Sequence, residues 1–115
     1  MLLIYGDENA LSQSELQACY GESAQLAHHL HAAGQFLATA PLHKTASAKS
    51  VRIREGQRFV TDGPFAETRE QLGGFFLIDA RDLDEALSIA ERIPMAKRGT
   101  VEVRPVVEIQ GLPAS

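Results

Sequence analysis

The chain has 115 residues, which is enough for one domain and too few for two ordinary ones. Hydrophobic residues make up 44% and charged residues 23%, as in a soluble globular domain, so an intrinsically disordered or collagen-like chain is excluded. Eleven Lys plus Arg against fifteen Asp plus Glu give a net charge of −4, and this acidic balance argues against a nucleic-acid partner, which requires a basic surface.

The amino-terminal part of the chain predicts a strand followed by a long helix. Residues 1–5 are apolar without alternation, which is typical of a strand buried on both faces. Ser12 with Glu15 three positions later matches a capping box, and apolar residues then recur at three- and four-residue spacings. We therefore predict a helix over residues 13–33, with Gly34 immediately after its end.

The middle of the chain predicts a strand and then a hairpin. Residues 35–40 are typical of a strand, and Pro41 ends this strand or places it near a sheet edge. A polar loop leads to residues 50–54, where apolar and basic side chains alternate. Residues 55–57 (Glu-Gly-Gln) are typical of a hairpin turn, so residues 58–61 are predicted to form the return strand.

The carboxy-terminal part predicts a strand, a helix and a last strand. Residues 73–79 contain an apolar run that is typical of a buried strand. Asp82 is expected to cap a helix over residues 83–93, which Pro94 ends. The β-branched residues among 100–109 predict the last strand.

This order of elements predicts one α+β domain. Without the hairpin it is β-α-β-β-α-β, the ferredoxin-like pattern, so the hairpin is an insertion. Residues 1–110 form a single domain in this interpretation, and residues 111–115 form a tail. Two helices can cover only one face of a sheet, so we predict that a second copy covers the other apolar face in a homodimer. Alternatively, the inserted hairpin or the tail folds over that face.

Residues 60–75 (VTDGPFAETREQLGGF) are more particular than strand or turn chemistry requires. This segment resembles the signature of the YCII-related family, in its DGPF branch, and three other segments match that branch: residues 3–6 (LIYG), 82–86 (DLDEA) and 99–105 (GTVEVRP). The resemblance implies a ferredoxin-like domain of the dimeric α/β-barrel type with no settled activity. Because members are often encoded beside extracytoplasmic-function sigma factors, it also implies a functional link to such a factor.

Family members outside this branch carry a His on the first helix and an Asp after the second, proposed as a catalytic pair. In this chain those positions fall at Ser23 and Ile93, so the pair cannot be transferred to it.

The loop that follows the return strand carries the first candidate site. Asp62 and Glu67 are the candidate catalytic groups, because carboxylates close to an aromatic ring such as Phe65 can acquire a raised pKa and act as general acid or base. Phe65, Thr68 and Glu70 are the candidate ligand-binding residues of the same loop. The alternative is a purely structural loop, in which Asp62 and Thr68 cap turns and the glutamates are solvated.

Tyr5 and Arg104 are the candidate ligand-binding residues on strands. Tyr5 ends the first strand, where ferredoxin-like folds often open a cleft. Arg104 beside apolar surface would need a carboxylate such as Glu67, or an anionic ligand. The alternatives are a packed Tyr5 with a hydrogen-bonded hydroxyl and a solvated Arg104.

The sequence predicts neither a metal nor another cofactor. His28 and His31 share a helix face, but the chain contains no cysteine pair and no HExxH motif. The one cysteine, Cys19, cannot form an internal disulfide and is expected to be an inert core thiol. No run approaches the ~20 apolar residues of a membrane span, and no signal peptide is recognised, so we expect a cytoplasmic protein without membrane contact.

Two functional hypotheses follow. The first is a non-catalytic homodimeric module that binds a small molecule or has a regulatory role. The second is a metal-independent enzyme that uses acid–base chemistry on a small organic substrate, in a cleft beside the Asp62–Glu70 loop. The enzyme hypothesis predicts a semi-enclosed pocket containing at least two of Tyr5, Glu67 and Arg104.

Overall fold

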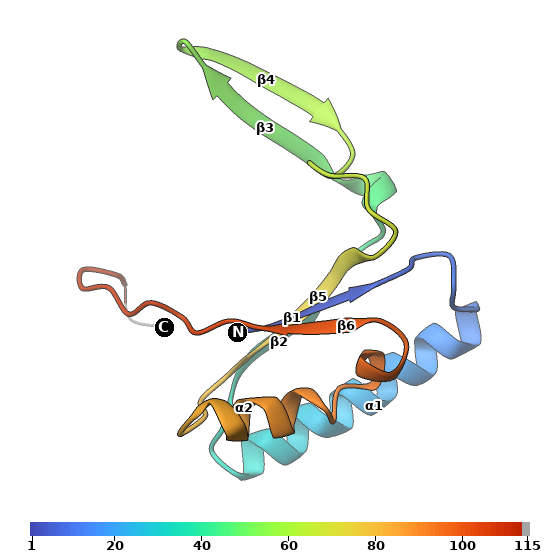
Figure 1. The fold of residues 1–115 in the computed structure, drawn as a ribbon, viewed down its shortest axis with the longest axis vertical. Coiled ribbons are helices and arrows are strands. Elements are labelled where there is room, and N and C mark those ends of the chain that lie inside the picture. Colours follow the sequence, from blue (N-terminus) through green and yellow to red (C-terminus); the bar gives the residue numbers. More distant parts are fainter. Residues whose placement is uncertain (114–115) are drawn as a thin grey trace.

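The computed structural model describes residues 1–113 and shows a helix-covered sheet with a separate hairpin (Figure 1). The elements in chain order are β1 (Leu2–Gly6), α1 (Gln13–Ala32), β2 (Phe36–Pro41), the 3₁₀ helix η1 (Thr45–Ser47), β3 (Lys49–Arg54), β4 (Gln57–Asp62), β5 (Gln71–Ile78), α2 (Leu83–Ala90), the 3₁₀ helix η2 (Pro94–Lys97) and β6 (Thr100–Val103). The main sheet has four antiparallel strands in the order β2-β5-β1-β6, and β3 pairs with β4 in the hairpin. This α+β arrangement is compatible with the predicted ferredoxin-like fold.

The start and end of α1 follow the predicted capping. The backbone N–H of Glu15 donates to Ser12 Oγ at 3.2 Å, and the backbone N–H of Ser12 donates to Glu15 Oε1 at 3.1 Å, which completes the capping box. Gly34 has a φ of +75°, in the left-handed region that glycine adopts without strain after a helix. The predicted helix boundaries are therefore confirmed to within a residue.

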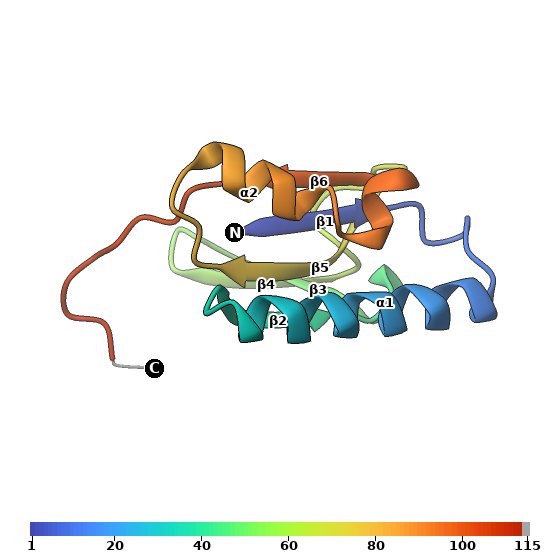
Figure 2. The same ribbon diagram turned by 90° about the horizontal axis from the view of Figure 1, so that it is seen from below.

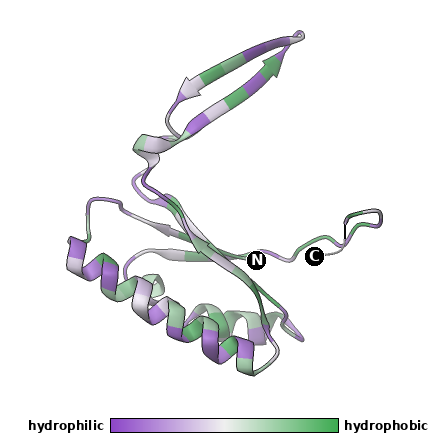
Figure 3. Ribbon diagram, turned by 180° about the vertical axis from the view of Figure 1, so that it is seen from behind, coloured by the Kyte–Doolittle hydropathy of each residue, from purple (hydrophilic) through white to green (hydrophobic). Residues whose placement is uncertain are grey.

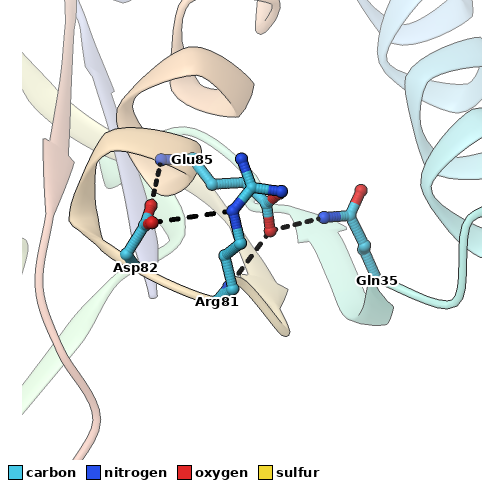
Figure 4. Close-up of polar contacts among 4 residues, drawn as sticks. All are labelled: Gln35, Arg81, Asp82 and Glu85. Atoms are coloured by element: carbon cyan, nitrogen blue, oxygen red, sulfur yellow. Dashed lines mark hydrogen bonds and ion pairs between the residues drawn. The ribbon is translucent and has the colours of Figure 1, made fainter.

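A polar network at the start of α2 joins this helix to the segment before β2 (Figure 4). Asp82 caps the helix by accepting the backbone N–H of Glu85 at 2.8 Å, as predicted. The carboxylate of Glu85 accepts Gln35 Nε2 at 2.9 Å and the backbone N–H of Arg81 at 3.0 Å, and it pairs with the Arg81 guanidinium at 2.8 Å. These contacts fix one end of α2 over the sheet.

Two carboxy-terminal elements are shorter than predicted. Helix α2 ends at Ala90 and not at residue 93, because the residue before a proline is disfavoured in the α conformation and the chain tightens into the η2 turn at Pro94. Strand β6 ends at Val103 and not at residue 109. Pro105 explains this difference, since a proline has no N–H to continue the strand pairing.

The hydrophobic core lies between the two helices and one face of the sheet (Figure 2). Leu2 and Phe76 point from the central strands toward the helices and are 0% and 1% exposed. The core is completed by residues of α1, α2 and the turn after it: Leu26, Leu30, Ile89, Ala90 and Ile93. Because β5 and β1 are the central strands, these side chains anchor both helices to the middle of the sheet.

The opposite face of the main sheet carries apolar side chains without a covering layer. Successive strand residues alternate between faces, so Leu3 and Phe75 point away from the face that holds Leu2 and Phe76. Tyr5, Leu72 and Leu77 occupy the same face, which we call the open face. Neither helix lies on it, and the hairpin stands clear of it (Figures 1 and 2).

Replacing a core phenylalanine tests this arrangement. Phe76→Ala is expected to lower the free energy of unfolding by about 3–5 kcal/mol, because the buried ring leaves a cavity. Phe65→Ala is the matched control and should change it by less than about 0.5 kcal/mol, because Phe65 is 84% exposed. Urea unfolding followed by circular dichroism measures both, and equal losses would contradict the placement of Phe76 in the core.

Candidate functional site

A pocket of about 350 Å³ lies between the first half of α1 and the helix-facing side of the sheet. Its apolar lining comes from β1, α1, β5 and the segment after α2: Ile4, Leu16, Cys19, Ala24, Phe76, Ile93 and Met95. Its polar end comes from the loops that follow β1 and β2 and from the start of β5: Asp7, Glu8, Ser12, Lys44 and Gln71. A volume of this size is within the usual range for small-molecule sites.

The pocket exists because only the second half of α1 packs tightly on the sheet. The buried residues of α1 are Leu26 and Leu30, whereas Leu16 and Cys19, about two to four turns earlier, remain half-buried. On β5, Phe76 fills the space under the second half of the helix, but two positions earlier Gly74 has no side chain to fill the corresponding space. Because glycine has no side chain, the sheet side of the pocket remains unfilled at this position.

Gly74 is also required by its neighbouring strand. A Cβ at this position would lie 2.9 Å from the carbonyl oxygen of Ala40 on β2, closer than real Cβ atoms approach. The pairing of β2 with β5 therefore leaves no room for a larger residue at position 74, and the adjoining part of the pocket stays empty.

The polar end is held by hydrogen bonds between loops that are distant in sequence. The carboxylate of Glu8 accepts both the backbone N–H of Thr45 at 2.7 Å and its hydroxyl at 2.5 Å, joining the loop after β1 to η1. Asp7 pairs with Arg69 at 3.6 Å, and Gln71 Nε2 donates to the carbonyl of Thr68 at 2.9 Å. The end of the pocket is thus preformed in the single chain.

Glu15 joins the start of α1 to the turn before β6. Its carboxylate lies 2.8 Å from Arg98, which follows η2. The hydrogen bonds from Ser12, the backbone one above all, and the contact with the Arg98 guanidinium lower the pKa of the Glu15 carboxyl. This ion pair links the start of α1, where Ser12 lines the pocket, to the end of η2, whose Met95 also lines it.

The predicted loop residues lie outside this pocket, on the surface of the single chain. Asp62 is exposed and paired with Lys49, and Phe65 is 84% exposed. Glu67 is exposed, and the Thr68 hydroxyl donates to the backbone carbonyl of Glu70 at 2.6 Å. Among these predicted residues, only Thr68 and Glu70 contact each other through a hydrogen bond within residues 1–113.

The two predicted strand residues are also separate from the pocket. Tyr5 is half-buried on the open face. Arg104 is exposed and lies 3.6 Å from Glu102, two residues earlier in the chain. The side chain of Glu70 is held by the Thr100 hydroxyl, which donates to it at 2.8 Å. The pocket between α1 and the sheet contains none of Tyr5, Glu67 and Arg104.

The sequence interpretation missed the pocket and misjudged one of its residues. Cys19, expected to be an inert core thiol, is half-buried and lines the pocket. A usable signal was present in the small residues Ala24, Ala40 and Gly74, which leave space where larger side chains would pack.

The family model described as the YCII-related domain matches residues 1–110. An uncharacterized protein of Rhizobium meliloti (strain 1021) is 39% identical over 110 residues, which cover 91% of this chain and 89% of that protein. Within residues 1–113, no helix combines the length and the apolar character needed to cross a bilayer.

A pH series tests the role of Glu15. Its pKa is lower in the folded chain than in the unfolded chain, so the ionised carboxylate stabilises the fold, and this stabilisation is lost as the pH falls through the folded pKa. The difference in unfolding free energy between the wild type and Glu15→Gln should be constant above about pH 5.5 and should shrink at lower pH. Glu22→Gln, on the exposed side of the same helix, is the control. A difference that does not change with pH would rule out this role.

Proposed function

Because this chain belongs to the YCII-related domain family, we propose that it is a homodimeric, non-catalytic module of the DGPF branch that binds a small, largely apolar organic molecule. The observation that carries this proposal is the preformed pocket between α1 and the sheet, with its apolar lining and one polar end. The apolar body of a ligand would displace water from the lining, and the polar end would orient it.

The composition of the pocket favours binding over acid–base catalysis. The positions at which other family members carry the proposed His and Asp are Ser23 and Ile93, and both of them line the pocket. Neither side chain exchanges protons near neutral pH. Of the two carboxylates at the polar end, Glu8 is held by Thr45 and Asp7 by Arg69. Both carboxylates at the polar end are therefore engaged by other side chains.

The homodimer in this proposal uses the open face. A face of this kind, with Leu3, Phe75 and Leu77, is a larger apolar surface than monomers usually leave in water. The Cα radius of gyration is 16.1 Å, compared with about 13 Å for a compact domain of this length, so a single chain is unusually extended. Two copies joined through their open faces would form the dimeric α/β-barrel arrangement.

The cellular setting belongs to the same proposal. We place the module in the cytoplasm, because the chain has one cysteine and no internal disulfide. A functional link to an extracytoplasmic-function sigma factor rests on the family resemblance alone.

Ligand screening tests the pocket. Indole and octanoate, two small apolar probes, should raise the midpoint of thermal unfolding and shift the ¹H–¹⁵N signals of Leu16, Ser23 and Thr39. Ser23→Phe should abolish both effects by filling the pocket, whereas Ser88→Phe, on the exposed side of α2, should preserve them. Persistence of binding in Ser23→Phe would place the ligand elsewhere.

The same assay separates the two functional hypotheses. Asp62→Asn and Glu67→Gln should leave probe binding unchanged, because neither residue lines the pocket. Loss of binding in these two variants would favour the acid–base site at the Asp62–Glu70 loop.

The oligomeric state tests the open face. Analytical ultracentrifugation should show twice the mass of one chain, and Leu3→Asp should convert the protein to a monomer, because a buried carboxylate without a partner opposes association. Gln25→Asp, on the exposed surface of α1, should leave the dimer intact. A wild type that sediments as one chain at all concentrations would refute the homodimer.

A further inference from the structure

The β3–β4 hairpin, which we call the arm, has no packing partner in the described chain. Residues 51–62 are all exposed, and the two strands pair with each other from Lys49↔Asp62 to Arg54↔Gln57. The turn is tight, with φ of +51° at Glu55 and +75° at Gly56, so the strands are held in one register. A two-stranded hairpin alone is marginally stable in water, so a surface that covers the arm would stabilise it substantially.

One face of the arm carries three aliphatic side chains beside one arginine, Arg58, which lies opposite Ile53. Val51 and Val60 lie directly opposite each other and are 61% and 46% exposed, and Ile53 on the same face is 58% exposed. Figure 3 shows hydrophobic and hydrophilic residues alternating along β3, whereas β4 has two adjacent hydrophobic residues, Phe59 and Val60, of which Phe59 lies on the opposite face. The alternation on β3 is the pattern of a strand with one buried face, although nothing within residues 1–113 buries that face.

The arm stands over the open face of the main sheet. It leaves the body at the end of β2 and the start of β5, and Figure 1 shows it diverging from the sheet on the side away from the helices. Seen from below, the arm lies behind the sheet and overlaps its outline, so the two views agree (Figure 2). The arm and the open face therefore lie on the same side of the main sheet, with a space between them.

The charge of the arm is complementary to that of the remaining chain. Residues 49–62 contain four basic and two acidic side chains, a net charge of +2, whereas the whole chain carries −4. The remainder of the chain therefore carries −6. A basic arm is attracted to the acidic body of another copy, and identical copies can exchange this contact in both directions.

We propose that the arm of each copy packs through Val51, Ile53 and Val60 against a second copy seated on the open face. This inference rests on the proposed homodimer and adds a second contact to it. Each copy lies between the arm and the sheet of the other. In this arrangement the second copy buries the aliphatic side chains of the arm. The dimer interface then includes apolar contacts of the arm in addition to those of the sheet.

Limited trypsin digestion of the full chain tests the arm. Lys49, Arg52, Arg54 and Arg58 provide cleavage sites on it, and Arg81 on the helical side is an exposed reference site. In the wild-type dimer the arm should be cut at least tenfold more slowly than in monomeric Leu3→Asp, with cleavage after Arg81 equal in both. Dilution of the wild type below its dimer dissociation constant should expose the arm in the same way, which guards against misfolding of the variant.

Two isosteric substitutions provide the second measurement. Val51→Thr with Val60→Thr keeps the β-branched shape and adds hydroxyls to the apolar face, so the dimer dissociation constant should rise at least fivefold. Arg52→Thr with Arg54→Thr changes the opposite face and should weaken the dimer only at low salt.

The possible outcomes are distinguishable. A dimer whose arm is cut as fast as in the monomer would overturn the arm contact and leave the homodimer standing. Equal protection of the arm in dimer and monomer would show that it folds onto its own body, which also overturns the inference. A wild type that is never dimeric would refute the proposed homodimer and the arm contact together.

Discussion

The packing of two helices against one face of a four-stranded sheet is the constraint on which the other features depend. Leu2 and Phe76 provide the apolar surface in the middle of that face, and both helices are anchored to it. The surfaces that the helices do not pack against are the open face, the arm and the pocket under the first half of α1. The proposed pocket and the proposed dimer contact are both consequences of this one-sided cover.

The pocket results from the absence of a side chain at one position of β5, beneath the first half of α1. Helix α1 is a single straight element, so its first half must continue over the sheet whether or not side chains fill the space beneath it. Gly74 leaves that space empty, and the approach of β2 forbids a larger residue there. Loops from distant parts of the chain then close one end through Glu8 and Thr45. A preformed site of this kind loses little conformational entropy when a ligand binds.

The arm and the open face both leave apolar side chains in contact with water, which is unfavourable. In the proposed dimer a second copy would cover both surfaces, and the opposite net charges of arm and body favour association of two copies. The Asp62–Glu70 loop connects the arm to β5, and its contacts are those of a connecting segment: Asp62 with Lys49, and Thr68 with the backbone of Glu70.

Local chemistry in the sequence was enough to determine the elements of the fold. The capping box of Ser12 and Glu15, the Asp82 cap, and the Glu-Gly turn of the arm each depend on residues a few positions apart, so each could be predicted. The effect of Pro105 on the last strand was equally local but was overlooked. By contrast, the pocket joins residues from β1, α1, β2, β5 and η2, and its polar end joins the loop of Glu8 to Thr45. Only the tertiary structure decided these features. Contacts between residues far apart in the chain determine which side chains pack together and where space remains between them.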